Sequence, residues 1–110
     1  MGINYQLDRA WANTSKAVRQ CQKADKSLAD GNADSAASHF EKALNYFSVA
    51  AEHLSKADDD ASVKAGKLLD AGNVQLEKAI EQYVEGDTDS AESHYEKALD
   101  KYDEVFDLID

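Results

Sequence analysis

The sequence predicts an all-α protein of four antiparallel helices, built from two copies of one helical hairpin. Its 110 residues include no proline and five glycines, and they are rich in Ala, Leu, Lys, Glu and Asp. This composition favours helix over sheet. Apolar residues recur at alternating spacings of three and four, which places them on one face of a helix. Residues 31–44 recur as residues 86–99, an offset of 86 − 31 = 55, and such repetition indicates a duplicated structural unit.

The first hairpin is expected to span residues 1–57. Its first helix is predicted over residues 4–30, and Gly31 ends that helix because glycine readily adopts the left-handed conformation. The second helix should run over residues 35–56, with the Asp34 carboxylate capping its amino terminus. The apolar face of the first helix consists of Leu7, Ala10, Thr14, Ala17, Cys21, Ala24 and Leu28, widened by Trp11 and Val18. That of the second consists of Ala36, Phe40, Ala43, Phe47, Ala50, Leu54 and Ala57.

The second hairpin is expected to span residues 58–110. An acidic run at residues 58–60 separates the hairpins and caps a third helix over residues 61–85. Gly86 ends that helix, and Asp89 caps a fourth helix that runs to the carboxyl terminus. The apolar faces consist of Ala65, Leu69, Gly72, Leu76, Ala79 and Tyr83, and of Ala91, Tyr95, Ala98, Tyr102, Val105 and Ile109. Since no linker separates the hairpins, residues 1–110 are predicted to form one domain.

The two hairpins can close into an up-down-up-down bundle or stack as an open array. Residues 1–29 carry a net charge of 5 − 2 = +3, and residues 84–110 carry 2 − 10 = −8. The first and last helices are neighbours in a closed bundle but lie at opposite ends of an open array. Their opposite charges therefore favour the bundle, although each exposed pair is worth less than about 1 kcal/mol.

The duplicated stretch resembles known helical modules. Residues 86–99 share Gly-Asp-x3-Ala-x3-Tyr-x-Lys-Ala-Leu with the second helix of a tetratricopeptide repeat, and residues 31–44 follow the same pattern. Residues 23–50 also resemble the microtubule-interacting and trafficking domain. The period of 55 differs from the tetratricopeptide period of about 34, so the likeness, which covers residues 23–50 and 78–102, concerns the hairpin. Both families dock peptides or helices in grooves, which implies a protein or peptide partner and no catalysis.

Composition and charge narrow the partner class. A net charge of −10 argues against binding to nucleic acid, because phosphates are bound by clustered Lys and Arg. A basic protein or peptide is electrostatically favoured. The single cysteine, Cys21, excludes an intrachain disulfide and indicates a reducing compartment. No apolar run approaches the roughly 20 residues of a membrane span, and no signal peptide is recognised at the amino terminus, so a cytoplasmic protein without membrane contact is expected.

The sequence favours binding over catalysis. It contains no Ser-His-Asp set, no glycine-rich phosphate loop and no zinc-spaced Cys/His cluster. We therefore expect a non-enzymatic interaction or adaptor module that requires no cofactor. The candidate partner-binding residues are Trp11, His39, Tyr46 and His94.

His39 and His94 also support an alternative function. They occupy equivalent positions in the two repeats, at the same height on diagonal helices of a closed bundle. If both turned inward, they could hold a metal ion or a small ligand. Metal sites in bundles normally add carboxylates three or four residues away, and both histidines lack them. The competing interpretation is a pair of histidines at the boundary of the core.

A calcium loop is a further alternative for the start of the second helix. Asp30, Asn32, Asp34 and Glu41 match positions 1, 3, 5 and 12 of an EF-hand loop. Ser35 stands where that loop needs glycine, and the helical face begins inside the supposed loop. A helix from Ser35 onward would exclude calcium binding here.

Overall fold

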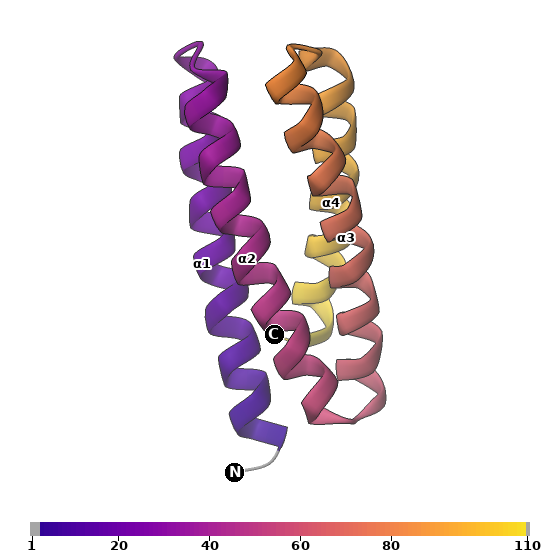
Figure 1. The fold of residues 1–110 in the computed structure, drawn as a ribbon. Helices are drawn as coiled ribbons and strands as arrows, with labels where there is room; N and C mark the ends of the chain where they lie inside the picture. Colours follow the sequence, from indigo (N-terminus) through magenta and orange to yellow (C-terminus); the bar gives the residue numbers. More distant parts are fainter. Residues whose placement is uncertain (1–2, 110) are drawn as a thin grey trace.

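The computed structural model describes residues 3–109, which form four α-helices (Figure 1). The helices are α1 (Ile3–Ala29), α2 (Ala33–Ala57), α3 (Asp60–Glu85) and α4 (Thr88–Ile109). Successive helices run antiparallel and form a rod 44 Å long and 18 Å across. The predicted all-α bundle of two hairpins is confirmed. Within residues 3–109, no helix is long and apolar enough to cross a membrane.

Both hairpin turns use glycine as predicted, but the helices that follow begin earlier than predicted. Gly31 and Gly86 adopt left-handed backbone angles, with φ of +77° and +90°. The residue after each glycine then caps the next helix. The Asn32 side chain accepts a hydrogen bond from the Ser35 backbone N–H at 3.0 Å, and Asp87 accepts one from the Ser90 N–H at 3.3 Å.

The prediction of Asp34 and Asp89 as caps is therefore wrong. Because the chain re-enters helical geometry two residues after the glycine, α2 begins at Ala33 and α4 at Thr88. Asp34 and Asp89 lie in the first helical turn, where a carboxylate still interacts favourably with the positive end of the helix dipole.

The two hairpins are joined by a short acidic turn between α2 and α3. Asp58 adopts a left-handed φ of +72° at the end of α2. Asp59 caps α3, as the acidic run predicted, by accepting a hydrogen bond from the Ser62 backbone N–H at 3.2 Å. Hydrogen bonds from Ser62 hold the pKa of the Asp59 carboxyl below its ordinary value. This turn holds the second helix of one hairpin beside the first helix of the next.

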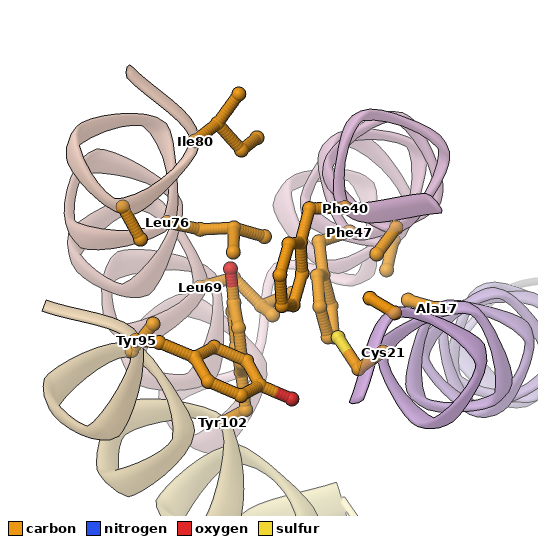
Figure 2. Packing of buried hydrophobic residues seen from close by; sticks show 14 of the residues in the cluster. Ala17, Cys21, Phe40, Phe47, Leu69, Leu76, Ile80, Tyr95 and Tyr102 are labelled. Atoms are coloured by element: carbon orange, nitrogen blue, oxygen red, sulfur yellow. The ribbon is translucent and has the colours of Figure 1, made fainter. Parts of the chain in front are cut away.

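The core is formed by the predicted faces of all four helices, and aromatic rings from α2, α3 and α4 meet across the bundle (Figure 2). Phe47 stacks on Tyr102, with ring centroids 3.6 Å apart. Phe40 stacks on Tyr83 at 5.5 Å and meets Tyr95 edge-on at 4.7 Å. Every predicted face residue of α2 and α3 is buried.

The four helices are not packed equally closely. Each helix contacts its neighbours in the closed order α1–α2–α3–α4, but α1 and α4 approach each other least closely. The core face of α1 is built from small side chains, namely Ala10, Thr14, Ala17, Cys21 and Ala24. Small residues permit close packing of α1 on α2 and fill little of the space between α1 and α4. The seam between α1 and α4 therefore stays open.

Candidate functional site

The open seam forms a groove, which we call the α1–α4 groove. One hollow of about 210 Å³ lies midway along the seam. Its walls are Val18, Cys21, Gln22 and Asp25 of α1, and Tyr95, Leu99, Tyr102, Asp103 and Phe106 of α4, with Phe47 of α2 at its base. A second hollow, of about 340 Å³, continues it toward the hairpin turns and shares Asp25, Tyr95 and Leu99 with it. We call this second hollow the Asp25 pocket.

The walls of the groove are apolar and its edges are acidic. Val18 and Leu28 of α1, and Leu99 and Phe106 of α4, are each half-buried along the groove. Four exposed carboxylates, from Asp25, Glu92, Glu96 and Asp103, accompany them. The groove thus combines unfilled apolar contact surface with concentrated negative charge.

Asp25 and Tyr95 connect the two walls of the groove. The Tyr95 hydroxyl donates to Asp25 Oδ2 at 3.4 Å, a length typical of a weak hydrogen bond. Figure 2 shows this hydroxyl pointing from α4 toward α1. Desolvation raises the pKa of the Asp25 carboxyl above its ordinary value, and the Tyr95 bond offsets part of that rise. Burial likewise raises the pKa of the Tyr95 hydroxyl. The Asp25 carboxylate is therefore incompletely solvated in the unliganded groove.

Cys21 lies beside this pair and is buried in the core. Burial raises the pKa of its thiol to about 12. The thiolate is the nucleophilic form of cysteine, so the raised pKa and the burial of Cys21 both disfavour its reaction at neutral pH. Its position in the core agrees with its place on the predicted face of the first helix.

Tyr83 lines the Asp25 pocket and carries a buried, unsatisfied polar group. Its side chain is 1% exposed, yet its hydroxyl finds no hydrogen-bond partner among the described residues. Burial, together with the nearby carboxylates of Glu92, Asp25 and Glu96, raises the pKa of this hydroxyl to about 12. A buried hydroxyl without a partner is unusual in proteins.

The two repeated histidines are held apart, each within its own hairpin. His39 Nδ1 lies 2.9 Å from Gln20 Oε1 across the α1–α2 interface, and His94 Nδ1 lies 2.8 Å from Gln75 Oε1 across the α3–α4 interface. Because an amide oxygen only accepts, each Nδ1 carries the donated proton. Both histidines therefore link the two helices of a hairpin.

No observation favours the metal-binding alternative. Among the residues that the structure describes, no group of three or more His, Cys, Asp or Glu side chains is placed to hold a metal ion. The calcium interpretation of residues 30–41 is wrong, because α2 begins at Ala33 and the supposed loop is helical from there onward.

The remaining candidate residues lie on different faces. Tyr46 is half-buried, and the ammonium group of Lys16 lies 5.9 Å from its ring centroid at the α1–α2 interface. Trp11 is 46% exposed, so it does not widen the buried face of α1 as predicted. It precedes Val18 by seven residues and Asp25 by fourteen, so it shares the groove side of α1.

The sequence reasoning did not find the groove, although a signal for it was present. Beside the core face of α1, a second stripe is formed by residues spaced seven apart, namely Trp11, Val18 and Asp25. Beside that of α4, Leu99 and Phe106 are likewise spaced seven apart. Such a second stripe marks a helix surface that meets something other than its own hairpin partner.

Comparison of the chain with protein-family models, with curated proteins and with solved structures gives no match.

Proposed function

We propose that the protein is a non-enzymatic interaction module whose α1–α4 groove binds an amphipathic helix of a partner protein. One observation supports this most directly. Half-buried apolar side chains from two antiparallel helices line an open seam that carries carboxylates along its edges. A docked helix would cover the apolar walls with its own apolar face, as helical peptides do in hydrophobic grooves. The hairpin resemblance to peptide-binding modules agrees with this role.

The dimensions of the groove suit a short helix. Its α4 wall runs from Glu92 to Phe106, a separation of 106 − 92 = 14 residue steps and about 21 Å at 1.5 Å per step. A ligand helix of about four turns matches that length. Apolar residues at positions i, i+3 or i+4, and i+7 of the ligand would face the walls. Exposed Trp11 extends the α1 wall, and aromatic side chains of this kind often dominate binding energies.

Charge selects a basic partner over a second copy of this chain. The protein has a net charge of −10, and four carboxylates accompany the groove walls. Two copies docked through this face would bring like charges together, which disfavours association. A helix with Arg or Lys beside its apolar face complements the edges instead. Exposed ion pairs contribute less than about 1 kcal/mol each, so the apolar walls would supply most of the affinity.

A displayed library of helical peptides of about 16 residues, randomised on one face and its flanks, tests the proposal. Selection against the wild-type protein should enrich apolar residues at i, i+3 or i+4, and i+7, flanked by Arg or Lys. Phe106→Ala should weaken binding of the selected peptides. Leu108→Ala is the matched control, because Leu108 is equally half-buried near the end of α4 but lies with α3 residues in a separate hollow.

Three results would refute helix docking in the groove. The first is selection of acidic or uncharged flanks. The second is binding that survives Phe106→Ala while Leu108→Ala removes it. The third is a wild-type protein that forms a dimer in solution through this face. Light scattering would show this as a dimeric wild type and a monomeric Phe106→Ala variant. A cytoplasmic location is part of the proposal, and its support is the single buried cysteine, Cys21.

A further inference from the structure

The Asp25 pocket has features that the rest of the groove lacks. It is the larger of the two hollows, at about 340 Å³, and three carboxylates line it together with two tyrosines. The carboxylates belong to Asp25 at the carboxyl-terminal end of α1 and to Glu92 and Glu96 in the first turns of α4. They contribute a formal charge of −3 at neutral pH, and no basic side chain lines the pocket. The pocket is therefore a local concentration of hydrogen-bond acceptors.

The unpartnered hydroxyl of Tyr83 adds an independent indication that a ligand belongs here. The hydroxyl is inaccessible to solvent and forms no hydrogen bond among the described residues, although the side chain lines the pocket. Leaving such a group unsatisfied is unfavourable to the folded protein. A ligand that donates a hydrogen bond would satisfy the hydroxyl oxygen after a small movement of the side chains that cover it.

Extending the proposed function, on which this inference rests, we propose that the Asp25 pocket binds the guanidinium group of one arginine of the docked helix. Asp25 is the principal carboxylate partner, and the Tyr83 hydroxyl is an additional acceptor. Glu92 and Glu96 complete the negative field at the mouth of the pocket. The half-buried side chains of Leu28 and Leu99 contact the methylene groups of the arginine.

The chemistry of the pocket selects arginine over lysine. A guanidinium group presents five N–H donors in a plane, binds a carboxylate through two parallel hydrogen bonds, and stacks on aromatic rings. Asp25 uses only one long bond, from Tyr95, among the contacts described, so its carboxylate retains free acceptor positions. The tyrosine rings line the same hollow. Lysine offers a compact and strongly hydrated charge that would leave several of these acceptors unused.

The direct test uses three blocked amino acids that differ only at the side-chain head. N-acetyl-arginine amide, N-acetyl-lysine amide and N-acetyl-citrulline amide are titrated into isotope-labelled protein, with detection by NMR. The arginine probe should bind in the millimolar range (about 1 mM, near −4 kcal/mol) and shift the Tyr83, Tyr95 and Asp25 signals. The lysine probe should bind several-fold more weakly, and the neutral citrulline probe should not bind. Binding should also lower the pKa of the Asp25 carboxyl, because a bound cation stabilises its charged form.

Two variants and one control locate the site. Asp25→Asn should lower the affinity for the arginine probe by about tenfold or more, which is the usual effect of losing a hydrogen bond between charged groups. Asp103→Asn is the matched control, because Asp103 lines only the neighbouring hollow, and it should change affinity by less than about twofold. Tyr83→Phe should lower the affinity for the arginine probe, because it removes an acceptor. It should also raise the melting temperature of the free protein, because the hydroxyl that it removes is unsatisfied without ligand.

The outcomes separate this inference from the proposed function. Equal binding of the arginine and lysine probes, no binding of either, or no effect of Asp25→Asn would overturn the arginine pocket. Helix docking would still stand if selected peptides bind wild type and fail with Phe106→Ala. Conversely, if the arginine probe binds through Asp25 but no helical peptide is selected, docking fails and the pocket is overturned as a partner-helix site. A lower melting temperature for Tyr83→Phe would contradict the role given to its hydroxyl.

Discussion

Two helical glycines in α3 allow one substitution to be tested in two environments. Gly72 is buried against the last helix. A Cβ atom added there would lie 2.6 Å from Tyr102 Cε1 and 3.0 Å from its Cδ1. The ring is held in place, because it stacks on Phe47 and its hydroxyl donates to Asn73 Oδ1 at 2.7 Å. At Gly66 the nearest neighbour of an added Cβ would be Leu54 Cβ, at an ordinary 3.8 Å.

The two Ala variants should therefore change stability in opposite directions. Replacing a helical glycine by alanine gains about 1 kcal/mol of helix propensity, and Gly66→Ala should realise most of that gain. Gly72→Ala should lose about 1–3 kcal/mol to overpacking and about 1 kcal/mol if the Tyr102–Asn73 hydrogen bond breaks. Its net effect is a destabilisation of about 1–3 kcal/mol after the propensity gain.

Urea unfolding followed by circular dichroism measures both effects on one scale. In thermal unfolding of a chain of this length, 1 kcal/mol corresponds to about 4 °C, so the melting temperature of Gly66→Ala should lie several degrees above that of wild type and that of Gly72→Ala several degrees below it. Adding Tyr102→Leu to Gly72→Ala should recover part of the loss, because leucine removes the atoms that clash. Equal stability of Gly72→Ala and Gly66→Ala would refute the packing of α3 on Tyr102.

Three further predictions follow from the titratable groups. The Cys21 thiol, whose pKa burial raises to about 12, should resist iodoacetamide at pH 8 in the folded protein and react on unfolding in urea. Since folding favours the protonated thiol, its contribution to stability should decline as the pH rises above 9.0, its ordinary pKa. The raised pKa of Asp25 means that its ionisation opposes folding, so Asp25→Asn should raise the melting temperature at pH 7. That advantage should vanish below about pH 3.8, where the unfolded carboxyl is also protonated. His39→Ala and His94→Ala should each cost about 1 kcal/mol in thermal unfolding, and the costs should add because the two residues lie in different hairpins. Non-additive costs would indicate that the two histidines interact.

The helical architecture followed from the sequence because its signals are local and repeated. Phe40, Phe47, Leu69 and Leu76 are all fully buried as their three-and-four spacing predicted. The caps of α2 and α4 were placed two residues late, because a residue able to cap, Asn32 or Asp87, stands two positions before an aspartate in the first turn. Backbone geometry after the glycine decides between them, and periodicity carries no information about that geometry. Boundaries therefore shifted while the faces of the helices did not.

The site was harder to predict because it depends on the packing between hairpins. The duplication correctly placed equivalent residues across the bundle, since Phe40 meets Tyr95 and Phe47 meets Tyr102, each pair offset by 55 residues. His39 neighbours Phe40 on the helix but turns toward Gln20 of its own hairpin. One residue of helical rotation, about 100°, thus separates the bundle centre from an outer interface. Histidines at equivalent heights need not meet.

The duplication also accounts for why the groove lies between α1 and α4. Exchanging the repeats maps the α1–α4 seam onto the α2–α3 seam, so the two seams are built from equivalent positions. Buried Ile80 of α3 corresponds to exposed Asp25 of α1. Buried Asn73 of α3 corresponds to half-buried Val18 of α1. The two-residue turn at Asp58 and Asp59 also holds α2 against α3, whereas no such turn joins α1 to α4. A buried apolar contact in one seam thus corresponds to a partly desolvated carboxylate in the other. Divergence at this position, within a symmetric scaffold, is what leaves an unfilled and negatively charged seam available to a basic helix.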